Sequence, residues 1–179
     1  MNMKTEQVFK DLKDLKKKAN KHSNLNFIID CNHEPCCPHS LENSNYGMMR
    51  VIEHQKMGRL NIKKKEDGLF IDNKKVEIFC FKDQEDINYE EYRNILKDKT
   101  VLNANILDQL IINPNLIPDD WYNGDGFLRI HFGGTIYADI NNSLYVRCLL
   151  RRKNIFRDVV CCIDSPIDLS DNFTAILSD

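Results

Sequence analysis

The sequence predicts an α+β fold: N-terminal helices with a small antiparallel hairpin sheet, then two short helices and a four-stranded antiparallel meander. Three observations lead to this class. Apolar residues near the N-terminus recur at helical spacing, the cap residues Asn88 and Asn103 each precede a short apolar stripe, and apolar residues alternate with period two after Phe127. We therefore expect two subdomains, a helical and hairpin unit over residues 1–99 and a helix-plus-sheet unit over residues 100–179.

The first elements are expected to be a helix, a strand and a loop. Over residues 5–21 the apolar side chains fall on one face of a helix, and lysines fill the other positions. The short apolar run 25–29 predicts a buried strand. Two prolines within residues 31–40 exclude regular structure there, so this decapeptide is expected to be a loop.

A second helix and a hairpin sheet are expected next. Apolar residues recur along one side of a helix from about Leu41 or Tyr46 to Met57, and Gly58 can end it. Three short apolar runs then follow, and the turn residues between them predict an antiparallel sheet. The strands are expected at Leu60–Ile62, Leu69–Ile71 and Val76–Phe81.

Two short helices are expected in the middle of the chain. Asn88 followed three residues later by Glu91 has the spacing of a capping box. Asn103 can cap a second helix that runs to Ile112, where Asn113 and a proline end it. Both segments place their apolar residues on one stripe, as helices that cover a sheet do.

Four strands are expected to form the C-terminal meander, because apolar and polar residues alternate and turn residues separate the runs. Their expected bounds are Phe127–Phe132, Thr135–Ile140, Leu144–Leu150 and Ile155–Ile163. The preceding helix is the nearest partner for one face of this sheet. The residues expected to be buried together are Leu107, Leu110, Ile111, Ile136, Val146 and Val159. The acidic tail 164–179 is expected to wrap around the domain or to fray.

Composition and charge restrict the function classes. The N-terminus has no apolar signal core, and no stretch approaches roughly 20 apolar residues, so a cytoplasmic protein is expected. Seven cysteines, an odd number with two adjacent pairs, favour reduced thiols over a disulfide framework. The net charge of -2 argues against general binding of polyanions. The familiar catalytic motifs with fixed spacing are not found in the sequence.

Four segments of the C-terminal half occur in a recognisable order: Val101–Leu110, Leu116–Trp121, Phe132–Tyr137 and Leu144–Arg147. Together they read as a helix, an I-P-x-x-W linker and a meander with the words G-T-I-Y and L-Y-V-R. Over about residues 101–179 this pattern resembles a module of uncharacterised bacterial proteins. The resemblance implies a helix-and-sheet fold and brings no known activity.

The loop 31–40 has the composition of a metal site. Cysteine thiolates and histidine imidazoles are the ligands that Zn²⁺ prefers in proteins. The candidate ligands are Cys31, His33, Cys36 and His39. Because Cys37 directly follows Cys36, at most one of these two is expected to join Cys31 and His39 on a single ion, with His54 as a distant fourth ligand. Two alternatives remain open: a proline-stiffened loop with reduced thiols, and a catalytic pair with Cys37 as nucleophile and His39 or His54 as base.

A second candidate site is a basic face of the meander. Alternation along the strands predicts that several basic and aromatic side chains gather on one open face. These side chains are Arg129, Tyr145, Arg147 and Arg157. Arginine offers a planar donor fork for carboxylate or phosphate, which is common at interfaces. A solvated polar face is the alternative, because half-exposed antiparallel sheets commonly have one.

We therefore expect a non-enzymatic intracellular interaction protein that binds a macromolecular partner through its C-terminal sheet. A protein is the expected partner, with no membrane and no required cofactor beyond possible zinc. One alternative is a small thiol- or zinc-dependent enzyme that uses the 31–39 loop. The other is a nucleic-acid-binding protein that uses the lysine-rich N-terminal helix and the arginines of the sheet.

Overall fold

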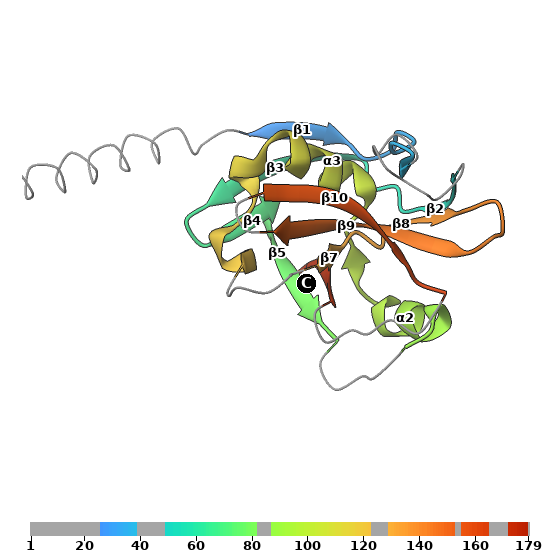
Figure 1. Ribbon diagram of the computed structural model, residues 1–179. Helices are drawn as coiled ribbons and strands as arrows, with labels where there is room; N and C mark the ends of the chain where they lie inside the picture. Colours follow the sequence, from blue (N-terminus) through green and yellow to red (C-terminus); the bar gives the residue numbers. More distant parts are fainter. Residues whose placement is uncertain are drawn as a thin grey trace, which may run out of the picture.

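The computed structural model describes residues 26–38, 49–81, 87–122, 129–152, 155–164 and 172–178 (Figure 1). These residues form a mixed sheet of eleven strands with two α-helices packed against it. The predicted fold, N-terminal helices followed by a separate four-stranded meander, is wrong because strands from both halves of the chain join this sheet. The helix expected over residues 5–21 lies outside the described residues.

The antiparallel sheet expected from the three runs within residues 60–81 is present, and a strand at residues 27–30 adds to its edge. The bounds of these strands are β1 (Phe27–Asp30), β3 (Arg59–Lys65), β4 (Gly68–Ile71) and β5 (Lys74–Cys80). β1 pairs with β3, β3 with β4, and β4 with β5. The β4–β5 turn places Asp72 and Asn73 at φ angles of 47° and 71°, a left-handed conformation that Asp and Asn tolerate better than most residues.

The helix expected to end at Met57 is replaced by a strand, β2 (Arg50–His54). β2 pairs antiparallel with β8 (Thr135–Ala138), and the register shifts between Val51 and Glu53. This bulge interrupts the period-two alternation. The apolar residues of β2, Val51 and Ile52, are adjacent and do not alternate with polar ones, so the sequence lacks the period-two signal that predicts a strand.

The two central helices begin where their caps predict. They are α2 (Tyr89–Leu96) and α3 (Ala104–Ile112), with β6 (Thr100–Val101) between them. Asn88 and Glu91 form both hydrogen bonds of the capping box, each 3.0 Å long. Two 3-10 helices follow α3, at η2 (Pro114–Leu116) and η3 (Asp119–Tyr122). Neither described α-helix has the length and apolar character that crossing a membrane requires.

The C-terminal strands form a branched arrangement instead of a meander. Their bounds are β7 (Arg129–His131), β9 (Leu144–Arg152) and β10 (Ile155–Cys162), in addition to β8. β9 and β10 form a long antiparallel hairpin. Both β7 and β8 pair with β9, so they lie one after the other along it, and the Gly133–Gly134 turn separates them.

The tail that was expected to wrap or fray supplies a central strand, β11 (Asn172–Leu177). β11 pairs antiparallel with β5 and parallel with β7, so it joins the strands of the two chain halves. The subdomains predicted for residues 1–99 and 100–179 therefore share one sheet. The apolar run from Phe173 to Leu177 is short, but strands on both sides satisfy its backbone.

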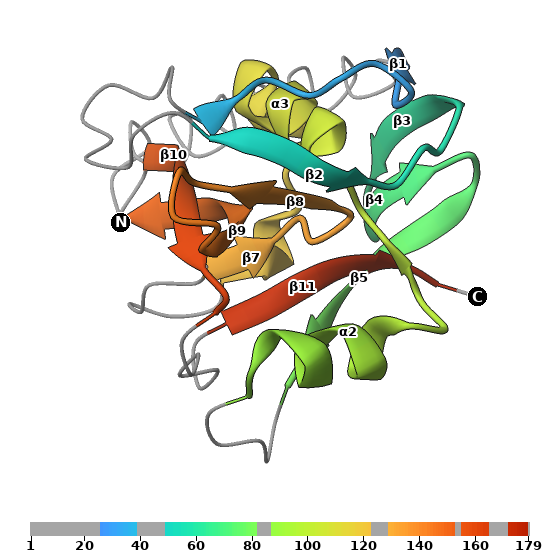
Figure 2. The ribbon, with the colours of Figure 1, turned by 90° about the vertical axis from the view of Figure 1, so that its right-hand side faces the viewer.

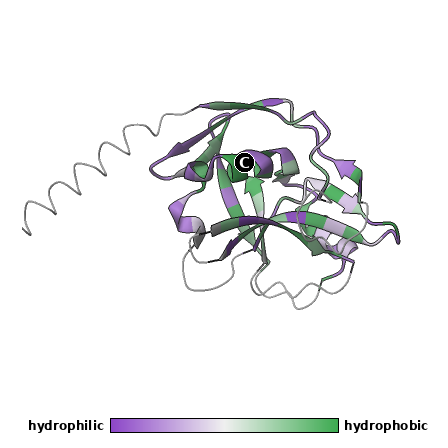
Figure 3. Cartoon of the chain, turned by 45° about the horizontal axis from the view of Figure 1, so that its top comes forward, coloured by the Kyte–Doolittle hydropathy of each residue, from purple (hydrophilic) through white to green (hydrophobic). Residues whose placement is uncertain are grey.

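The core consists of two main clusters on opposite faces of β9. Figure 2 shows α3 on one side of the strands and α2 on the other. Leu149 packs in the cluster of α3, whereas Val146 packs in the cluster of α2. The six core residues expected to meet are therefore divided: Leu107, Leu110 and Ile111 pack on the α3 side, and Ile136, Val146 and Val159 on the α2 side. The strands of the sheet carry both hydrophobic and hydrophilic residues (Figure 3).

Candidate functional site

The described members of the predicted zinc set in the 31–40 loop, Cys31, His33 and Cys36, do not converge. Cys31 is fully buried, whereas Cys36 is exposed. The side chain of His33 is 82% exposed and lies 3.6 Å from the carboxylate of Asp30. His39 lies outside the described residues. Cys31, His33 and Cys36 therefore do not place their ligand atoms within reach of one ion.

The same loop is held through its backbone carbonyl groups. The carbonyl of Cys31 accepts hydrogen bonds from His54 Nε2 at 3.0 Å and from Asn103 Nδ2 at 3.3 Å. Asn105 Nδ2 donates to the carbonyl of His33 at 3.0 Å. Both asparagines come from the N-terminal end of α3, so this helix end fixes the path of the loop.

The geometry does not favour the catalytic pair with Cys37 and His54. The Cys37 thiol donates to the carbonyl of Met49 at 2.7 Å. His54 Nε2 faces a carbonyl, so it carries the proton, and Nδ1 accepts from the hydroxyl of Thr135 at 2.9 Å. That hydroxyl in turn accepts from the backbone N–H of Ala104 at 3.1 Å. Both ring nitrogens of His54 are thus engaged in hydrogen bonds that stabilise the fold.

The four residues of the predicted basic face lie on two different faces. Arg129 and Arg157 both pair with Leu150, one from β7 and one from β10, so they flank it on the same face, and both are exposed. Tyr145 and Arg147 project from the opposite face of β9 and are buried. The structure therefore brings the first two together and separates them from the other two.

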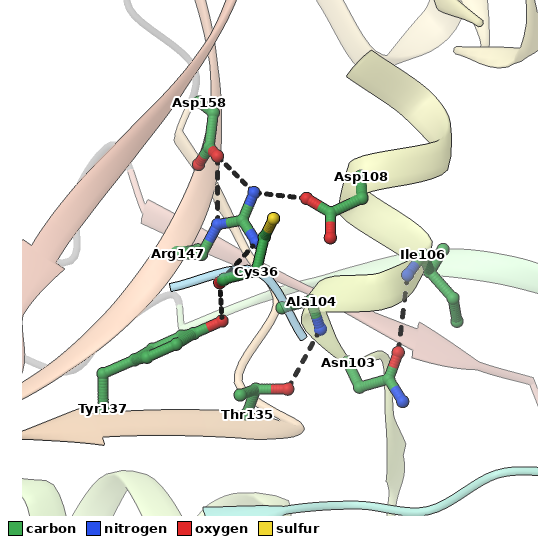
Figure 4. Close-up of polar contacts among 9 residues, drawn as sticks. All are labelled: Cys36, Asn103, Ala104, Ile106, Asp108, Thr135, Tyr137, Arg147 and Asp158. Atoms are coloured by element: carbon green, nitrogen blue, oxygen red, sulfur yellow. Dashed lines mark hydrogen bonds and ion pairs between the residues drawn. The ribbon is translucent and has the colours of Figure 1, made fainter. Parts of the chain in front are cut away.

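Arg147 forms a buried ionic cluster beneath α3 (Figure 4). Its guanidinium contacts Asp158 of β10 twice and Asp108 of α3 at 2.5 Å. It also donates to the carbonyl of Cys36 at 3.3 Å, which accepts from Tyr137 Oη at 3.2 Å as well. Burial opposes the charge of Arg147, but the bonds to Asp158 and Asp108 outweigh this and raise its pKa. The cluster joins a helix, two strands and the loop.

A Cys/His group lies on the other face of the same strands. Among the described residues, one group of three has ligand atoms close enough for a metal ion: His131, Cys148 and Cys161, all within 4.8 Å of one another. His131 pairs directly with Cys148 across β7 and β9. Cys161 pairs with Val146, so it is the diagonal neighbour of Cys148 on the same face of the hairpin.

The surroundings of this group shift the pKa values of its two thiols in opposite directions. Hydrogen bonding from Cys148 and then from His131 lowers the pKa of the Cys161 thiol, although burial opposes the shift. Burial raises the pKa of Cys148. Cys161 therefore has the lower pKa of the two thiols. The register of the predicted β9–β10 hairpin is the signal that would have identified this pair from the sequence.

A groove of about 810 Å³ opens between the end of β2 and α2. Leu96 and Ile136 contribute buried apolar surface to its lining. Glu53 of β2 accepts from Arg93 Nη1 at 2.9 Å and from Tyr89 Oη at 3.1 Å, and these bonds connect the strand to the helix. The charged residues of its lining are Glu53, Glu90, Arg93, Lys97 and Lys99.

The Gly133–Gly134 turn forms another part of the groove lining. A Cβ atom at Gly133 would lie 2.2 Å from Tyr92 Oη, so a side chain there would displace the tyrosine. Gly134 donates to the carbonyl of Leu102 at 3.0 Å and accepts from the N–H of Gln55 at 2.7 Å. The turn therefore fixes the spacing between the end of β2 and the segment that leads into α3.

Comparison of the chain with protein-family models, with curated proteins and with solved structures gave no match. The resemblance of residues 101–179 to a bacterial module stays a prediction.

Proposed function

We propose that this chain is a non-enzymatic interaction protein that binds a protein partner in the groove between β2 and α2, to which the C-terminal part of the sheet contributes the Gly133–Gly134 turn and Ile136 of β8. The observation that carries the proposal is the groove itself: its volume of about 810 Å³ falls in the range of ligand-binding clefts. It combines buried apolar surface at Leu96 and Ile136 with charged side chains at its rim. This combination is typical of protein interfaces.

The charge of the groove favours a protein segment over nucleic acid. Arg93, Lys97 and Lys99 supply positive charge, but Glu53, which pairs with Arg93, and Glu90 line the same groove. A phosphate backbone would be repelled by the carboxylates, whereas a peptide with both signs of charge complements the lining. A groove bordered by a strand and a helix can also take up an extended segment.

The imidazole of the groove supports binding rather than proton transfer. His54 lines the groove, but its two nitrogens bond to Thr135 and to the carbonyl of Cys31. A general base must reach a substrate proton with a ring nitrogen that accepts it. We therefore assign His54 a positioning role at the end of β2.

The test is affinity capture of partners from the native host with matched charge-reversal variants. Glu90→Lys combined with Lys97→Glu reverses two exposed charges of the groove lining. Glu77→Lys combined with Lys74→Glu is the control, because both residues are exposed on β5. The proposal is supported by a protein that wild type and the control retain and that the groove variant loses. The same protein, once purified, should bind wild type directly.

Three outcomes would overturn it. An unchanged partner set with the groove variant would remove the groove from the binding surface. If the partner were lost only with Arg129→Glu combined with Arg157→Glu, the binding surface would instead be the exposed arginines beside Leu150. Recovery of nucleic acid whose retention falls steeply with salt would replace the protein partner by a polyanion.

A further inference from the structure

The group formed by His131, Cys148 and Cys161 has the residue types and the spacing of a metal site. Each residue comes from a different strand, so the β7–β9 and β9–β10 ladders fix the spacing of the three residues. Zinc bonds of about 2.3 Å to sulfur and about 2.0 Å to nitrogen place tetrahedral ligand atoms about 3.5–3.8 Å apart. In the structure the three ligand atoms lie within 4.8 Å of one another. Small side-chain rotations that move these atoms by about 1 Å therefore bring them to the separations of a zinc site.

The charge of the group selects a divalent ion. Two thiolates and a neutral imidazole balance the charge of Zn²⁺, so the complex can be buried without a net charge. A monovalent ion would leave a buried negative charge in the same cage. Thiolate and imidazole together also suit zinc better than the oxygen-seeking ions Mg²⁺ and Ca²⁺.

We propose that His131, Cys148 and Cys161 bind one Zn²⁺ ion on the α2-facing side of the sheet. Among the described residues no fourth His, Cys, Asp or Glu joins the group, so water completes the tetrahedron. Cys161 is only half-buried, whereas the other two ligands are fully buried, so solvent reaches the ion from the β10 side. The ion joins three strands and stabilises the folded state.

The test uses the full chain purified with and without added zinc. We expect one zinc per chain by elemental analysis, and X-ray absorption of the zinc form should show two sulfur neighbours and two nitrogen or oxygen neighbours. Replacing Zn²⁺ by Co²⁺ should give the charge-transfer absorption of two thiolates. These measurements need no variant, so a variant that fails to fold cannot obscure the answer.

Matched variants locate the ion. Cys161→Ser should weaken zinc binding by at least about 100-fold, since even the loss of an outer hydrogen-bond partner costs about 10–100-fold. Cys162→Ser is the control, because it is the next residue of β10 and projects from the opposite face. Circular dichroism of the metal-free forms should show the wild-type spectrum for both variants, which separates lost binding from lost folding.

Four results would overturn the proposal. The first is that the chain binds no zinc at micromolar concentration, and the second is that the bound zinc has three or four sulfur neighbours. The third is that Cys161→Ser and the control weaken zinc binding equally. The fourth is a disulfide between Cys148 and Cys161 in freshly purified protein. Loss of zinc only after Cys36→Ser would place the ion in the 31–40 loop instead.

Discussion

Arg147 donates from Nε to a carboxylate oxygen of Asp158 at 3.0 Å, and the two side chains are only 5% and 7% exposed. The two residues lie on neighbouring strands of the β9–β10 hairpin, and Asp108 of α3 completes the contact from above the sheet. The guanidinium of Arg147 and the carboxylate of Asp158 are thus withdrawn from water together, whereas the side chain of Asp108 stays 30% exposed. Their mutual pairing is what makes this burial tolerable.

Removal of Arg147 should therefore be strongly destabilising. Arg147→Met leaves two carboxylates without their cation and should lower the free energy of unfolding by about 3–5 kcal/mol. Urea denaturation measures this loss. Arg157→Met, at an exposed position of β10, should stay within about 0.5 kcal/mol of wild type. Equal stability of the two variants would show that Arg147 is not buried.

Gly133→Ala should destabilise the protein through a clash with one identified atom. The added Cβ would lie 2.2 Å from Tyr92 Oη, and Tyr92→Phe removes that oxygen. The loss of stability in the double variant should therefore be smaller than the sum of the two single losses. Thermal unfolding of the four proteins measures the coupling, and strict additivity would contradict the close approach.

The capping box of α2 should contribute measurable stability. Asn88→Ala removes the side-chain oxygen that accepts from the N–H of Glu91, and should cost about 1 kcal/mol. Asn94→Ala changes the same residue type at an exposed position within α2 and serves as the control. In urea denaturation we expect wild type and the control to have similar free energies of unfolding, and Asn88→Ala to have a lower one. If the control were less stable than Asn88→Ala, this result would contradict the cap.

The buried thiol of Cys31 should make stability depend on alkaline pH. Burial raises its pKa from 9.0 to about 11 in the folded protein. Because the folded state favours the neutral thiol, this contribution is complete below pH 9 and is lost as the pH rises towards 11. The stability difference between wild type and Cys31→Ala should therefore shrink across this interval. A constant difference from pH 8 to 11 would contradict the burial.

Local signals in the sequence were sufficient for the short helices and the first hairpins. Asn88 and Asn103 cap their helices because a cap depends on residues within one turn. The strand β2 was missed because a bulge breaks its alternation, and only pairing with β8 selects the strand. β11 was missed because two partners distant in sequence stabilise it.

The candidate sites show the same limit. Alternation correctly places Tyr145 and Arg147 on one face, but it does not tell which face α3 covers, so a buried arginine was expected to be exposed. The proximity of Cys148 and Cys161 could have been predicted from the sequence, because the turn of the β9–β10 hairpin sets the register of its strands. The groove could not have been predicted from the sequence, because it depends on how β2 and α2 pack in three dimensions.

The position of β11 between β5 and β7 has a consequence for how the chain folds during synthesis. The β3–β5 hairpins can form as they leave the ribosome, since their contacts are local. The sheet cannot close until the residues of β11 emerge, and until then β5 and β7 expose unpaired edges and apolar side chains. The nascent chain is therefore most prone to aggregate just before residues 172–177 are released, and that is the interval in which a chaperone would protect it.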